Sequence, residues 1–102
     1  MMLRTHVLRA RKGKEKAMLQ FMRRDVPRML RKVPGCRVAY FARSQKNKRE
    51  FIWVSLWASN AAWKNAPKST PDWKRLGVKE KGIKFQARPP RNTHYDLILT
   101  VR

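Results

Sequence analysis

Residues 50–63, EFIWVSLWASNAAW, constrain the fold more than any other stretch of the chain. Side chains alternate across an extended strand, so residues 51, 53, 55 and 57 share one face, and residues 52, 54 and 56 share the other. Both faces are mostly apolar, and a strand buried on both sides lies in the middle of a sheet between two layers. A chain of 102 residues can hardly supply both layers. We therefore expect a partner subunit or a ligand on the second face.

The other periodic patterns predict one domain over residues 1–102, with the element order βαββαβ. Apolar residues recur at three- and four-residue steps in a long helix that Pro27 kinks, and Pro67 ends a shorter helix. A second capping sequence around residues 69–72 starts another helical segment with Trp73 inside. The expected elements are strands at 3–10, 36–43, 51–57 and 94–101, and helices at 14–33 and 60–66. Two helices on one face of a four-stranded antiparallel sheet form the ferredoxin-like α+β arrangement.

The charge of the chain is extreme and leaves several interpretations open. Twenty-six Lys and Arg residues against six Asp and Glu give a formal net charge of +20. Such a field attracts polyanions. A solvated surface, an RNA- or DNA-binding module, and a scaffold whose surface has been made cationic all fit this charge. For RNA, residues 49–56 loosely follow the third-strand motif of RNA-recognition domains, in which Phe51 and Trp53 would stack on bases.

Several classes of protein are excluded by the residues that are present. The lone cysteine, Cys36, cannot form an internal disulfide and suits a reducing, cytoplasmic location. With His6 and His94 as the two histidines, a structural zinc site is not expected. The longest apolar run, residues 51–58, is too short to span a membrane. The sequence also contains no phosphate-binding loop, no Ser-His-Asp pattern and no paired acids at a defined spacing.

The order of several short motifs resembles the antibiotic biosynthesis monooxygenase-like family of dimeric α+β barrels. The resemblance rests on Pro34-Gly35-Cys36 after the long helix, on the V-S-L-W-x-S-x-x-A pattern within residues 51–62, and on Ser69 with Trp73 further along the chain. The resemblance covers nearly the whole chain. It implies an obligate homodimer in which the two bare sheet faces pack into a barrel. It also implies an aromatic substrate held between sheet and helices, and activity that uses neither metal nor flavin.

The resemblance also suggests which residues form the site. His6 lies near the place where related haem-degrading enzymes carry a strand asparagine, and a neutral imidazole there can donate a hydrogen bond or act as a base. Haem degradation itself is not expected, because Ala66 and Pro67 stand where those relatives have a tryptophan. The alternatives are that His6 is a packed or rim residue and that the tryptophans fill the core. The candidates are His6 as the catalytic residue and Trp57, Trp63, Trp73 and Tyr40 as substrate-binding residues, with no cofactor.

Overall fold

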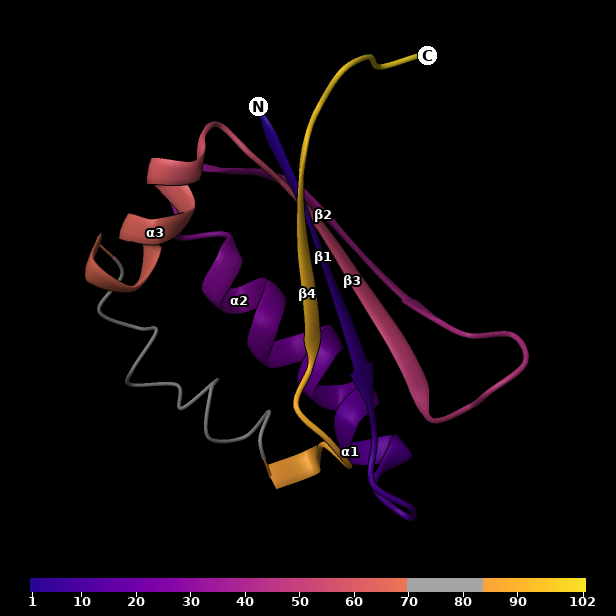
Figure 1. Cartoon of the computed structure of the whole chain (residues 1–102). Helices are drawn as coiled ribbons and strands as arrows, with labels where there is room; N and C mark the ends of the chain where they lie inside the picture. The colour runs from indigo at the N-terminus through magenta and orange to yellow at the C-terminus, as the bar shows by residue number, and fades with distance from the viewer. Residues whose placement is uncertain (70–83) are drawn as a thin grey trace.

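The computed structural model describes residues 1–69 and 84–102, so the segment predicted around Trp73 lies outside the described residues. Figure 1 shows the elements in the order βαββαβ, as predicted, with the first helical region divided by a π-helical segment. The strands are β1 (Met2–Arg9), β2 (Cys36–Arg43), β3 (Glu50–Trp57) and β4 (Arg91–Asp96). The helices are α1 (Glu15–Gln20), η1 (Phe21–Asp25), α2 (Val26–Leu30) and α3 (Asn60–Ser69).

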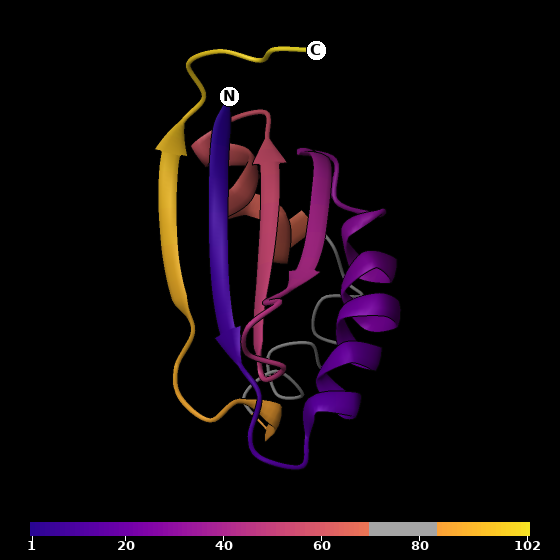
Figure 2. The same ribbon diagram turned by 90° about the vertical axis from the view of Figure 1, so that its right-hand side faces the viewer.

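The sheet confirms the ferredoxin-like topology. Its four strands are all antiparallel to their neighbours and run in the order β2-β3-β1-β4. The two apolar strands β1 and β3 therefore lie in the middle, as the pattern of β3 predicts. Figure 2 views the sheet face-on, with α3 behind it and no described element in front of it. One face of the sheet is covered by helices and the other is bare.

The long helical region continues past Pro27, as predicted. The backbone N–H of Val26 bonds to the carbonyl of Phe21, five residues earlier, so the turn before the proline is π-helical rather than α-helical. Proline supplies no N–H to the helix, and a local change of hydrogen-bond spacing is one way to accommodate it. The apolar stripe stays on one side through this turn. Its fully packed members are Met18, Phe21, Met22, Val26, Met29 and Leu30.

The two faces of β3 have different surroundings. Phe51, Trp53 and Trp57 are buried in the core against the helices, whereas the intervening residues are half-buried on the bare face. This orientation contradicts the base-stacking interpretation, because Phe51 and Trp53 cannot reach a nucleic acid on the open face. The neighbouring strands place exposed apolar residues on that face instead. These include Val38 and Tyr40 of β2 and Tyr95 of β4.

Two predicted boundaries were wrong. The last strand is Arg91–Asp96 rather than 94–101, because its pairing with β1 reaches Met2 at Asp96, and the Leu97 N–H then bonds to the Met1 carbonyl. Beyond Asp96, β1 offers no further residue for strand pairing, because β1 begins at Met2. The side chains of Ile98, Leu99 and Val101 are exposed. Helix α3 also passes Pro67 and ends at Ser69. A proline removes one helical hydrogen bond, which weakens a helix without necessarily ending it.

The Pro34-Gly35 junction fixes the position of α3. A Cβ atom added at Gly35 would collide with the Cβ of Ala62 on α3, so only glycine allows this close approach. The Ala58 N–H donates to the Gly35 carbonyl at 2.9 Å. Ser59 caps α3 as expected, since its Oγ accepts from the Ala62 N–H at 3.1 Å. The helix that carries Trp63 is thereby held over the end of the sheet.

Candidate functional site

A cluster of cationic and aromatic side chains fills the space between the sheet and α3. The register in which β1 pairs with its two neighbours explains how this cluster forms. His6 lies opposite Trp53 of β3, and Arg4 lies opposite His94 of β4. The His6 and Trp53 rings are 5.4 Å apart between centroids, and Trp63 packs edge-on to His94 at 4.6 Å. Residues from β1, β3, β4 and α3 thus meet on the covered face of the sheet.

Arg4 occupies the centre of this cluster. Its side chain is 9% exposed, and its guanidinium carbon lies 5.2 Å from the centroid of Trp63 and 5.9 Å from that of Trp53. These distances are within the range of cation–π attraction. Its Nη2 donates to Nδ1 of His6 at 3.1 Å. Burial lowers the pKa of Arg4 from its ordinary value by penalising the charged form.

His6 is held in a neutral form with a defined tautomer. A guanidinium can only donate, so Nδ1 of His6 accepts and the ring proton sits on Nε2. Burial lowers the pKa of His6 to about 4; the nearby Arg4 charge adds to this effect, and a hydrogen bond with Asn92 opposes it. His6 is therefore a weak base at neutral pH, with its Nδ1 lone pair already used. The arrangement favours hydrogen-bond donation by His6 over the general-base role that the sequence also allowed.

The neutral His6 makes a prediction about acid stability. Its pKa in the folded state lies below the ordinary 6.5, so its contribution to stability is present above pH 6.5 and is lost as the pH falls toward 4. The expected loss is about 3 kcal/mol of unfolding free energy across that window. His6→Gln removes the titrating group and should flatten this part of the curve. Urea unfolding at pH 7, 5.5 and 4 measures the unfolding free energy of both proteins. If that free energy changes with pH to the same extent in the wild type and in His6→Gln, the prediction is contradicted.

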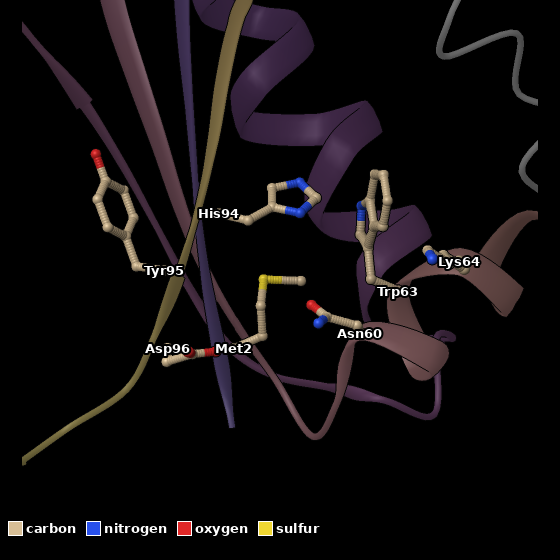
Figure 3. A pocket seen from close by; sticks show the side chains of 7 residues that line it. All are labelled: Met2, Asn60, Trp63, Lys64, His94, Tyr95 and Asp96. Atoms are coloured by element: carbon tan, nitrogen blue, oxygen red, sulfur yellow. The ribbon is translucent and has the colours of Figure 1, made fainter.

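A cavity of about 330 Å³ adjoins the cluster. Figure 3 shows Trp63 of α3 and His94 of β4 pointing toward one another in its lining, with Met2 and Asn60 nearby, whereas the Tyr95 ring points to the other side of β4. Its walls combine apolar surface from Met2 and aromatic rings with polar and charged groups, so a ligand here could make both apolar and hydrogen-bonding contacts. The lining residues are Met2, Asn60, Trp63, Lys64, His94, Tyr95 and Asp96.

The structure brings together some of the predicted site residues. His6 and Trp63 both contact Arg4, but Trp57 is a core residue that is 1% exposed and donates its indole N–H to Ser55 Oγ at 2.9 Å. Tyr40 is 67% exposed on the bare face and does not share a site with His6 within one chain. Trp73 lies outside the described residues.

Sequence reasoning missed Arg4 and His94. A signal for Arg4 existed, because it stands two residues before His6 and must share its face of the strand. Nothing in the sequence tied His94 to them, since the pairing of β1 with β4 joins residues about ninety positions apart. Within residues 1–69 and 84–102, no three His, Cys, Asp or Glu side chains come close enough to hold a metal. No described helix is long and apolar enough to cross a membrane.

The sheet order and the helices on one face define a ferredoxin-like α+β protein, and comparison identifies its family. The family model for antibiotic biosynthesis monooxygenases matches residues 1–76, so the chain belongs to that family. The resemblance inferred from the Pro-Gly-Cys junction and the tryptophan-rich strand is thus confirmed. No curated protein matches the sequence at a comparable level.

Solved structures share the fold at low sequence identity. A Nitrosomonas europaea protein named as an antibiotic biosynthesis monooxygenase has a TM-score of 0.82 at 14% identity, covering 97% of this chain and 100% of its own. A variant of SnoaB, a cofactor-independent oxygenase from Streptomyces nogalater, has a TM-score of 0.81 at 11% identity, covering 98% and 95%. Rv0793 of Mycobacterium tuberculosis has a TM-score of 0.81 at 15% identity, covering 99% and 98%. At these sequence identities, the structural similarity shows a shared fold and no more.

Proposed function

We propose that this protein is a homodimeric, cofactor-independent oxygenase acting on a small aromatic molecule bound between the sheet and α3. The observation that carries the proposal is the cavity beside Trp63 and His94, adjoining the buried Arg4–His6 pair. Family membership and the fold shared with a protein named as a cofactor-independent oxygenase support it. The ring of Trp63 would stack on the substrate, and neutral His6 would donate a hydrogen bond from Nε2 by exchanging Asn92 for the substrate.

The electron balance limits the types of reaction that such an oxygenase can catalyse. Without an added reductant, the substrate itself must supply every electron that O₂ accepts. Conversion of an activated methylene to a carbonyl meets this condition, because one oxygen atom enters the carbonyl and the other leaves as water with both hydrogens. A hydroxylated aromatic with an acidic CH₂ beside its ring is one substrate class that meets this condition. In such a molecule, loss of a proton makes the carbon electron-rich enough to react with O₂.

The bare face of the sheet supports the proposed homodimer. A contiguous apolar sheet surface left in water promotes association and aggregation. Pairing of two identical faces would bury the half-buried residues of β1 and β3 together with Tyr40 and Tyr95. Each surface would meet its own copy across a two-fold axis. Binding of polyanions through the net charge of +20 alone stays a second proposal, compatible with this dimer because the charge does not require the bare face.

Oxygen uptake tests the activity. Purified protein without flavin, and with a chelator, should consume O₂ in proportion to its concentration when given hydroxylated aromatic methylene compounds. Trp63→Ala should lower kcat/KM about three- to tenfold, the value of one lost aromatic contact. Asn65→Ala, on the exposed side of the same helix, is the matched control and should leave the rate unchanged. Equal rates in the two variants would exclude Trp63 from the site, and no uptake with any compound of this class would reject the proposal.

A further inference from the structure

Arg4 is a buried cation that no carboxylate of the described residues balances. The neighbouring Arg9 on β1, by contrast, pairs with Glu50 at 3.7 Å. Arg4 instead contacts two indole rings and a neutral imidazole. Removing a charge from water costs several kcal/mol unless a counter-charge compensates it. A side chain kept in this position at such a cost suggests that a counter-charge arrives from outside the chain.

The groups around Arg4 are donors rather than acceptors. Nε of Arg4 and Nε1 of Trp53 are both buried and have no hydrogen-bond partner. His6 adds no free donor, because Arg4 occupies its Nδ1 and its remaining ring N–H is used by the hydrogen bond with Asn92. Buried polar groups in folded proteins are ordinarily paired, and those left unpaired require an explanation. Two unpaired donors, one of them on a buried cation, call for an oxygen that carries negative charge.

Arg4 lies directly behind the lining of the cavity. Three of the seven lining residues surround it: Met2 lies two positions away on the same face of β1, His94 lies directly opposite on β4, and Trp63 stacks over the guanidinium. Cross-strand neighbours have Cβ atoms about 4.5–5.5 Å apart. A ligand beside Trp63 and His94 is therefore within reach of Arg4. Lys64 adds a positive charge to the lining and Asp96 a negative one.

We propose that the aromatic ligand is anionic and that an oxygen of it, as a carboxylate, phenolate or enolate, pairs with Arg4. This inference rests on the proposed function for the location of the ligand and adds its charge. In the methylene oxidation described above, the same contact would stabilise the enolate that forms when the substrate loses its proton. Arg4 would then be both the specificity-determining residue and the group that makes this proton more acidic.

A pair of probes that differ in charge tests the inference. Binding of 2-naphthoate and of neutral 2-naphthamide is measured by tryptophan fluorescence and by calorimetry at 150 mM salt, for the wild type, Arg4→Met and Arg43→Met. Met matches the length of the arginine stem without its charge. Arg43 is exposed on β2, so its variant controls for the lost unit of net charge. Wild type should bind naphthoate at least about tenfold more tightly than naphthamide, and Arg4→Met alone should abolish that preference.

The outcomes separate this inference from the proposed function. Equal binding of both probes, unchanged in Arg4→Met, would overturn the anionic ligand while leaving an aromatic pocket in place. Failure of both probes to bind the wild type would overturn both proposals. A naphthoate preference lost equally in Arg43→Met would assign it to overall charge and overturn the role of Arg4. If Arg4→Met does not fold, binding of the two probes to the wild type is compared again at 500 mM salt. A naphthoate preference that persists would support pairing with the buried Arg4, and one that disappears would overturn it, because a buried ion pair is screened far less than surface charge.

Discussion

Val54→Lys is expected to convert the protein from a dimer to a folded monomer. Val54 is at the centre of the bare face, paired with Thr5 of β1 and Tyr40 of β2. In the proposed dimer the substitution places an unpaired charge in the interface, and the two-fold axis places it there twice. Each uncompensated charge costs about 3–5 kcal/mol, so two of them at the centre of the contact should separate the dimer. In the isolated chain, the same lysine would extend into water.

Light scattering on a sizing column measures this change. Wild type should show twice the chain mass of 12.2 kDa, and Val54→Lys should show 12.2 kDa with an unchanged circular dichroism spectrum. Lys48→Ala, in the exposed turn between β2 and β3, is a control that should remain dimeric. A wild-type mass near 12.2 kDa would refute the dimer, and a dimeric Val54→Lys would place the interface elsewhere.

Trp57→Ala should cost about 3–5 kcal/mol of unfolding free energy, the usual value for deleting a fully buried large aromatic. The ring is 1% exposed, and Trp57 pairs with Met2 on one side and Cys36 on the other. Its indole N–H also satisfies Ser55 Oγ in the core. Losing the ring leaves a cavity together with an unpaired hydroxyl. The protein is expected to be largely unfolded at 37 °C.

Two variants make this result interpretable. Trp57→Phe keeps most of the apolar volume and should lose less stability, whereas Trp63→Ala, at a half-buried position, should lose less than Trp57→Ala. Thermal and urea unfolding of the three proteins ranks them. A Trp57→Ala protein as stable as the wild type would contradict a core role and return Trp57 to the list of ligand-binding candidates.

Strand and helix periodicity was sufficient to predict the fold, and its failures have physical causes. The alternation in residues 50–57 correctly separated the buried Phe51 and Trp53 from the bare-face residues, although it could not say which set faced the helices. The last strand was misplaced because the apolar residues 97–101 look like a strand, whereas strand length was set by the available partner, β1. In β2, an irregular register between Cys36 and Val38 separates two residues that simple alternation assigns to one face.

The site was harder to predict than the fold. His6 and Trp63 were proposed by resemblance, and the structure places both against Arg4. Arg4 itself was hidden among 26 basic residues, because its position on the same strand face as His6 does not by itself show that its charge is buried. What distinguishes it is the ring of Trp63 folding back over β1, a contact between residues nearly sixty positions apart. Long-range packing of this kind leaves no local periodicity to read.

The sheet assigns its two faces to different tasks. Arg4, His6 and the cavity lie on the helical side, and the proposed dimer contact lies on the other, so each protomer would build a complete site from its own residues. The two sites would be separated by the full thickness of both sheets. Ligand titrations would therefore follow a simple hyperbola without cooperativity. A mixed dimer with one inactivated chain would retain half the activity of the intact pair, because neither chain lends a side chain to the other.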